Sequence, residues 1–256
     1  MDQSILSSRA IMGMYFAEME AAPAMPMVDG LSNLFSSDQA SETYKFLGQS
    51  PAMRAWVGGR QAKGFSGQGI TIVNTHYEAT IEVAKKDARR DKTPQIQARI
   101  AEFYQRAQSH WASLLSTLLL NAPSTACYDA QFFFDTDHVE GDSGTQDNDI
   151  TVDISALPAV VHGVVTAPSV EEMQQSILKG IAQILSFKDD RGEPMNENAR
   201  RFVVTVPVGL YLTAVAAVST LVTAALQQNL NPNLIAGLTV DVQMNARLTW
   251  TDSFAV

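Results

Sequence analysis

The chain has 256 residues, of which 46% are hydrophobic. This is enough to bury the core of one large domain or two small ones, and it excludes a disordered protein. The net charge of -9 argues against a protein whose whole surface coats nucleic acid, since such binding needs many Lys and Arg contacts to phosphate. Cys127 is the only cysteine, which excludes an internal disulfide. The N-terminus lacks a secretory signal, so a cytoplasmic chain is expected.

The N-terminal residues 1–41 are expected to form an arm. They are rich in Met, Ala, Ser and Gln and show no sustained apolar period, apart from one short helix predicted near residues 11–19. Residues 41–60 are expected to be a docking segment. In it, Leu47 and Trp56 are apolar anchors, and a short helical turn begins after Pro51.

Residues 70–92 are expected to project as a loop. The part at 70–83 is dense in β-branched side chains, which predicts two strands or one bent hairpin. Glycines precede it and make its approach flexible. A charged run, AKKDARRDK, follows at residues 84–92.

A long helix is predicted from residue 93. Thr93 and Pro94 are a helix start signal, and Asn121 with Pro123 ends the helix. Apolar residues between them recur at steps of three and four, which is one stripe over about seven turns. At about 1.5 Å per residue the helix would be about 40 Å long. The stripe consists of Ile96, Ile100, Phe103, Tyr104, Ala107, Trp111, Leu114, Leu115 and Leu118.

The second half of the chain interleaves predicted strands and helices. Ser169 and Glu172 predict a capping box at the start of one helix, and Pro207 opens another that runs to about Leu226. Because no regular βαβ repeat is visible, the predicted fold class is α+β. Strands are predicted at residues 150–154, 160–165, 202–206, 238–244 and 247–250, the last two as a pair.

Residues 202–240 carry no charge, yet they are not expected to span a membrane. Pro207 and Gly209 interrupt the stretch early, Thr and Ala outnumber Leu, and no basic residues flank its far end. A buried strand followed by a buried helix is the preferred interpretation.

Charge is distributed unevenly along the chain. Residues 43–106 hold eleven of the eighteen Lys and Arg residues and five acids, whereas residues 107–178 hold ten acids and no Lys or Arg. Such asymmetry suits subunits that pair opposite patches on identical neighbours. It also suits one monomer with a basic and an acidic solvated face. From charge alone, this second explanation is favoured.

The twelve residues Cys127–His138, CYDAQFFFDTDH, have two opposite interpretations. In the first, Asp135, Asp137 and His138 bind a divalent metal or act as acid and base, which indicates a metal-dependent hydrolase. The spacing does not match an EF-hand loop, and the other histidines show no recognisable ligand spacing. Those histidines are His76, His110 and His162.

The second interpretation of this segment is structural. The aspartates then cap turns and bind backbone donors, while Phe132, Phe133 and Phe134 fill the core. No catalytic signature surrounds Cys127, so a small buried core residue is expected there. No nucleotide-binding glycine loop occurs either. The sequence therefore predicts no enzyme activity, no metal and no cofactor.

The same segment resembles the CYDGQ-x-FFDTDH signature of the Mu-like major head subunit family. Residues 41–60 resemble a second region of that family, SENTYGWLGQ-x-P-x-x-R-x-W-x-G-x-R, and the elements between the two regions come in the same order. Two departures are Ala130, where the family usually has glycine, and Val139, where proline commonly follows the histidine. The matches in the second region are Ser41, Glu42, Leu47, Gly48, Gln49, Pro51, Arg54, Trp56, Gly58 and Arg60.

This resemblance implies the tailed-phage major capsid fold, called the Johnson fold. It implies an N-terminal arm and docking segment at residues 1–57, an extended loop at 58–92, a peripheral domain with a long spine helix at 93–167, and an axial domain at 168–256. The family continues with further strands beyond the position of Val256, so C-terminal strands are expected to be missing or shortened.

The implied function is that of a major capsid protein. Copies would assemble into hexamers and pentamers of an icosahedral phage head that encloses double-stranded DNA without sequence-specific binding. The implied partners are other copies of the chain and scaffold, portal and decoration proteins, with no membrane. The chain would be assembled in the host bacterial cytoplasm and reside in the virion.

Aromatic and arginine residues contribute disproportionately to interface energy, so the docking segment supplies candidates for contacts between subunits. The basic run of the extended loop supplies others, because basic loops can lie on acidic neighbours. The candidates are Arg54, Trp56, Arg60, Lys85, Lys86, Arg89 and Arg90.

Overall fold

The computed structural model of the chain describes residues 8–20, 25–47, 67–84, 86, 95–157, 162–227 and 238–256. They fall into two compact units. One unit is drawn from Met1–Ser36 and Asn74–Thr117, and the other from Ser37–Val73 and Leu118–Val256. The four-part division of the chain at residues 57, 92 and 167 stays a prediction.

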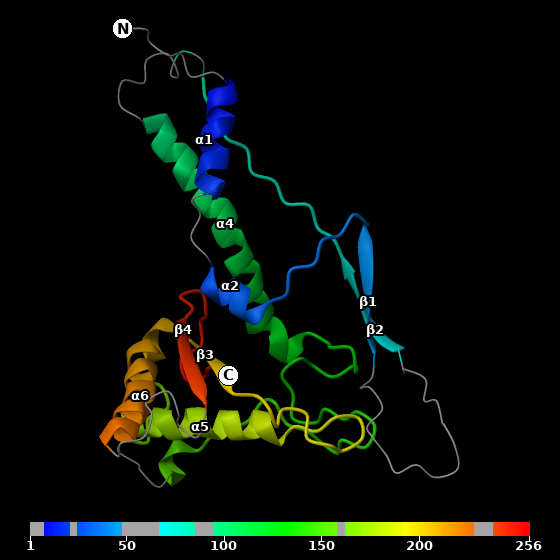
Figure 1. The fold of residues 1–256 in the computed structure, drawn as a ribbon, viewed down its shortest axis with the longest axis vertical. Helices are drawn as coiled ribbons and strands as arrows, with labels where there is room; N and C mark the ends of the chain where they lie inside the picture. The colour runs from blue at the N-terminus through cyan, green and yellow to red at the C-terminus, as the bar shows by residue number, and fades with distance from the viewer. Residues whose placement is uncertain are drawn as a thin grey trace. The chain divides into compact units, whose positions relative to one another are not determined.

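In the first unit, helix α1 (Ser8–Glu20) lies beside the first half of the long helix α4 (Gln95–Asn121) (Figure 1). The ring of Tyr15 on α1 contacts two aromatic rings of α4, with centroids 6.0 Å from Phe103 and 5.5 Å from Tyr104. A short helix, α2 (Pro26–Leu31), belongs to the same unit. The predicted helices at 11–19 and 93–121 are therefore confirmed, although residues 93 and 94 lie outside the described residues.

The apolar stripe of α4 is only partly covered. Ile96 and Ile100 are buried, whereas Trp111 is 55% exposed and Leu118 is 58% exposed. The periodicity predicted one apolar stripe, and the structure leaves these two residues of the stripe exposed. A stripe shows which face can be buried, but the neighbours that bury it are set by tertiary or quaternary contacts.

A two-stranded antiparallel sheet in the second unit joins β1 (Ser41–Leu47) to β2 (Gly67–Val73). Ser41 lies opposite Val73 and Leu47 opposite Gly67, and the hydroxyls of Thr43 and Thr71 are 3.0 Å apart. The sequence predicted two strands or one bent hairpin within residues 70–83. This prediction was wrong about the second strand, because residues 74–83 form no strand and the strand that includes residues 70–73 pairs with β1 instead. β-branched composition indicates a strand without specifying what it pairs with.

The core of the second unit combines two helices with a parallel strand pair. Helix α5 (Val170–Ser186) packs against α6 (Val208–Gln227), which connects β3 (Arg201–Val206) to β4 (Thr239–Met244) and contacts both strands (Figure 1). The buried residues of this core are Met173, Ile177, Ile181, Phe202, Val204, Val206, Leu210, Ala214 and Ala217. The predicted strand at 202–206 and the helix after Pro207 are confirmed, and mixed helix and sheet agrees with the α+β class.

Three strand predictions in this half were wrong. Residues 150–153 are irregular and lead into a 3-10 helix (Ile154–Ala156), and the described part of 160–165 holds no strand. Residues 247–250 do not pair with 238–244 either. Instead β4 pairs with β3, and Ala255 forms an antiparallel bridge to Thr205, with N to O distances of 2.8 and 3.0 Å.

The capping box at the start of α5 is present as predicted. The hydroxyl of Ser169 accepts a hydrogen bond from the backbone N–H of Glu172, and the Glu172 carboxylate accepts one from the backbone N–H of Ser169.

Among the helices described, none combines the length and apolar character needed to cross a bilayer.

Candidate functional site

The segment CYDAQFFFDTDH follows the end of α4 along the chain and begins with a tight hairpin. A 3-10 turn (Ala122–Ser124) follows the helix, and Ala126 then forms an antiparallel bridge to Phe132. The N–H of Cys127 donates to the carbonyl of Gln131 over 2.7 Å, and the N–H of Ala130 donates to the carbonyl of Cys127 over 3.3 Å. A three-residue loop whose last residue is left-handed is a common way to close such a hairpin.

Ala130 is the residue in the left-handed conformation, with φ of 70°. An L-residue with a Cβ is disfavoured there by about 1 kcal/mol, whereas glycine is not. The turn therefore keeps a backbone conformation that favours glycine, the residue usual in the family. Alanine at position 130 is strained in this conformation.

Replacing Ala130 with glycine is expected to stabilise the subunit by up to about 1 kcal/mol, because the strain disappears while the unfolded chain gains some entropy. Ala126→Gly, in the same hairpin, serves as the control. It relieves no positive φ and should destabilise the subunit by about 0.5–1 kcal/mol. Urea unfolding of the unassembled subunit measures both changes. A loss of stability in both variants would contradict the role given to the left-handed turn.

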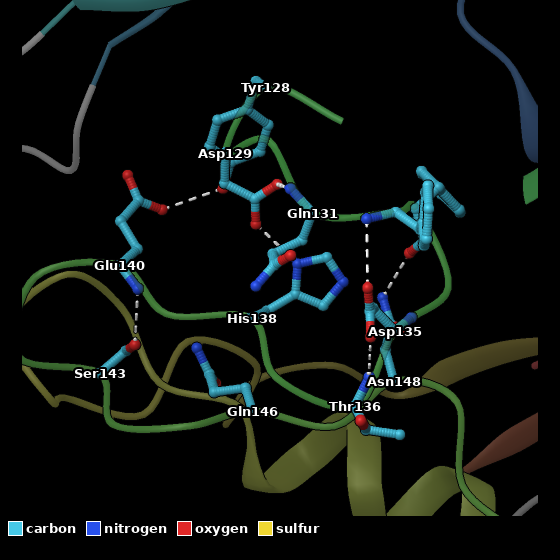
Figure 2. A network of polar contacts seen from close by, with 12 residues as sticks. Tyr128, Asp129, Gln131, Asp135, Thr136, His138, Glu140, Ser143, Gln146 and Asn148 are labelled. Carbon is cyan, nitrogen blue, oxygen red and sulfur yellow. Dashed lines mark hydrogen bonds and ion pairs between the residues drawn. The ribbon is translucent and has the colours of Figure 1, made fainter. Parts of the chain in front are cut away.

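A polar network holds the hairpin against the chain that follows it (Figure 2). Asp129 Oδ2 and His138 Nδ1 are 2.6 Å apart, and their side chains are only 11% and 18% exposed. The Tyr128 hydroxyl donates to Glu140 Oε2 over 3.0 Å. Burial raises the pKa of Tyr128 to about 12, with the Glu140 carboxylate as a second cause. The phenol therefore stays protonated and keeps donating at neutral pH.

Asp135 binds backbone donors instead of another side chain of opposite charge. Its Oδ1 accepts from the N–H of Thr136 over 2.8 Å, and its Oδ2 accepts from the N–H of Phe132 over 3.2 Å. The hydrogen bond from Thr136 is the main cause that lowers the pKa of Asp135. Asn148 closes the turn from outside, since its Oδ1 accepts from the Asp135 N–H and its Nδ2 donates to the Phe133 carbonyl, each over 2.8 Å (Figure 2).

The network continues into the acidic loop and the turn after α5. His138 and Gln146 pair through both backbone groups, at 3.0 and 2.8 Å. The Gln146 side chain then pairs with the backbone of Lys188, accepting from its N–H over 2.6 Å and donating to its carbonyl over 3.0 Å. The N–H of Asp142 donates to the carbonyl of Asp190 over 2.9 Å. The signature segment thus ties the chain after α4 to the chain after α5.

This geometry does not form the metal site that the sequence left open. The oxygens of Asp135 are occupied by backbone N–H groups, Asp137 is exposed, and Nδ1 of His138 faces Asp129. Throughout the described residues, no three His, Cys, Asp or Glu side chains come together as metal ligands. The predicted role of the aspartates as turn-capping residues is confirmed for Asp129 and Asp135.

The predicted packing of the three phenylalanines was wrong for two of them. Phe132 is 46% exposed and Phe133 is 51% exposed, so neither fills the core of a single subunit. Cys127 is a free thiol and is half-buried. Aromatic runs predict burial, but the sequence does not distinguish burial within one subunit from burial between subunits.

Most candidates for contacts between subunits lie outside the described residues, namely Arg54, Trp56, Arg60, Lys85, Arg89 and Arg90. Lys86 is described and exposed. Sequence reasoning missed Asn148, Gln146 and the partners Tyr128 and Glu140. Their contacts join positions that are brought together only by the fold, and no local spacing signals them.

Comparison with known proteins gives consistent results. Residues 10–156 match the family described as Mu-like prophage major head subunit gpT. The chain is 33% identical over 111 residues to the Mu-like prophage FluMu major head subunit of Haemophilus influenzae, a match covering 43% of this chain and 36% of that protein. It is 28% identical over 120 residues to the major capsid protein of Escherichia phage Mu, covering 47% of this chain and 39% of that protein.

Solved structures of bacteriophage JBD30 have a similar fold. Its decorated capsid matches with a TM-score of 0.57 at 23% identity, over 89% of this chain and 92% of that chain. Its procapsid matches with a TM-score of 0.57 at 21% identity, over 94% of this chain and 98% of that chain. The family match spans more than half of the chain, and the fold is that of a phage capsid protein. The chain therefore belongs to the Mu-like major head subunit family.

Proposed function

We propose that this chain is the major capsid protein of a tailed phage, and that its copies assemble into the hexamers and pentamers of an icosahedral head. The family match over residues 10–156 carries this proposal. The capsid fold over most of the chain supports it. The aligned stretches cover 36% and 39% of the two named relatives. What those proteins do as a whole is therefore proposed for this chain and does not follow from the alignment alone.

The site geometry supports a structural role for the signature segment. Asp129 and His138 are bound to each other, Tyr128 is bound to Glu140, and Asp135 accepts backbone N–H groups, so these four side chains of the segment are engaged in holding the turn together. The family and the capsid structures likewise point to a shell component and give no support to the hydrolase that the sequence left open.

The proposed partners are further copies of this chain together with scaffold and portal proteins. A decoration protein is also proposed, since the JBD30 capsid is described with minor capsid protein trimers on it. The shell would assemble in the bacterial cytoplasm and enclose double-stranded DNA. A net charge of -9 is compatible with a container that holds DNA without binding it tightly.

Expression of the chain is expected to yield closed particles visible by negative-stain electron microscopy and fast-sedimenting in gradients. Alanine at the four basic candidates should slow assembly at low salt, because attraction between opposite patches steers association. The difference should shrink at about 1 M salt, where screening is strong. The four are Lys85, Lys86, Arg89 and Arg90.

The control for this experiment replaces two cations outside the basic region of residues 43–106, Lys179 and Lys188, which are both exposed. It should leave the assembly rate nearly unchanged. A wild-type chain that stays a soluble monomer under all assembly conditions, or that is absent from the shell of purified virions, would sink the proposed function.

A further inference from the structure

An aromatic groove of about 690 Å³ lies within the second unit. It runs between α5, the chain that follows the signature segment, and the last residues of the chain. Its volume is within the range of about 300–1,000 Å³ found for binding pockets. The aromatic side chains that line it are Phe133, Phe134, Phe187, Trp250 and Phe254.

These aromatic side chains are not fully covered in a single subunit. Phe133 is 51% exposed, and the other four side chains are less exposed but not fully buried. Aromatic residues are enriched in the cores of protein interfaces, where a partner removes them from water. The composition of the groove therefore fits a contact with another protein chain.

The charges of the groove select the kind of segment that it can receive. Asp149 and Asp252 are exposed and are the only charged residues among the described residues that line it. The ion pairs found in the described part of the chain involve neither of them. An apolar segment with positive charges on both sides would complement this groove.

One segment of this chain has that composition. Residues 43–77 contain four Lys or Arg residues and no acid, and their centre, RAWVGGR, places Trp56 and Val57 between Arg54 and Arg60. We propose that this segment of a second copy docks in the groove, with Trp56 against the aromatic lining and the arginines opposite Asp149 and Asp252. The inference rests on the proposed function and assigns a place to three of its contact candidates.

Two other segments fit the groove less well. Leu34, 91% exposed, and Phe35 form an apolar pair, but Asp29, Asp38 and Glu42 surround them in sequence, and like charges would oppose docking beside two aspartates. The basic run at residues 85–92 has no aromatic side chain. The segment with Trp56 lies outside the described residues, and its match to the groove is one of composition and charge.

Directed disulfide formation between two variants tests this contact. In a Cys127→Ser background, one chain carries Ala55→Cys and the other carries Ser253→Cys, which lies on the groove. A disulfide between them must join two copies, and it requires Cα atoms within about 7 Å. A tag on one chain gives the mixed dimer its own size on a non-reducing gel. The control replaces Ser253→Cys with Ser219→Cys, an exposed position on α6.

Co-assembled particles are expected to form the mixed dimer with the groove cysteine at least about tenfold more than with the control, because docking raises the effective concentration. Particles in which the two cysteines do not react above the control level would overturn the groove assignment and leave the proposed function intact. Failure of the Cys127→Ser chain and of wild-type chain to form particles would count against the proposed function itself.

Charge reversal gives a second measurement. Asp149→Lys with Asp252→Lys is expected to reduce particle yield, and Arg54→Glu with Arg60→Glu in the same chain is expected to restore part of it. Restoration shows that the first pair folds and that the two sites meet. Unchanged yield in the lysine variant would contradict the proposed pairing of charges.

Discussion

Replacing Glu172 with alanine is expected to lower the free energy of unfolding of the subunit by about 3–5 kcal/mol. The side chain is fully buried. Its Oε1 accepts from the N–H groups of His162 and Gly163, over 2.9 and 2.7 Å, and its Oε2 accepts from the Ser169 N–H over 2.7 Å. Alanine leaves three backbone donors without this acceptor, at about 1–3 kcal/mol for each one that stays buried.

Two variants separate this effect from a general loss of acidic charge. Glu171→Ala removes the neighbouring exposed carboxylate and should change stability by no more than about 0.5 kcal/mol. Glu172→Gln keeps the shape and one acceptor oxygen but sets an NH2 group against the Ser169 N–H, so its loss should fall between the other two. Urea unfolding followed by circular dichroism measures all three. Equal losses for Glu171→Ala and Glu172→Ala would refute the proposed role of this carboxylate.

Replacing Gly141 with alanine is expected to destabilise the subunit by about 2–4 kcal/mol. Gly141 has φ of 56°, which disfavours any residue with a Cβ. An added Cβ would also collide with the backbone carbonyl oxygen of Asp190. That carbonyl accepts the hydrogen bond from Asp142, so the collision would break the link between the acidic loop and the turn after α5.

Gly144→Ala is the matched control for this prediction. Gly144 has φ of 72° in the same loop, but a Cβ there would meet open space. This variant carries the backbone strain alone, at about 1 kcal/mol. The difference between the two alanine variants in thermal or urea unfolding therefore measures the close approach to Asp190. If both variants lose the same free energy of unfolding, the close approach of Gly141 to the Asp190 carbonyl contributes nothing to stability.

The sequence predicted the features that depend on neighbours along the chain. Helices α1 and α6, the end of α4 at Asn121, and the capping box of α5 each have a local signal, such as a proline, an apolar period or a Ser and Glu three residues apart. The strand at 202–206 was visible as a short apolar run. The family resemblance carried by residues 41–60 and 127–138 was confirmed.

The candidate site was predictable only in part. The aspartates were expected to bind backbone donors, and Asp129 and Asp135 do so. Their specific partners were not predictable, because Asn148 lies thirteen residues from Asp135 and Lys188 lies forty-two residues from Gln146. Such contacts depend on how distant turns are placed, and hydrogen bonding at one residue carries no signal about a partner so far away.

The sequence by itself determined where helices α1, α4, α5 and α6 form and to which family the chain belongs. Only the tertiary structure decided that β1 pairs with β2, that β3 pairs with β4, and that Ala255 instead of residues 247–250 extends that sheet. Helices are specified by contacts three and four residues apart, whereas strand pairing joins residues distant in sequence. The same limit explains Trp111 and Phe133, whose apolar character predicts burial but does not say which surface covers them.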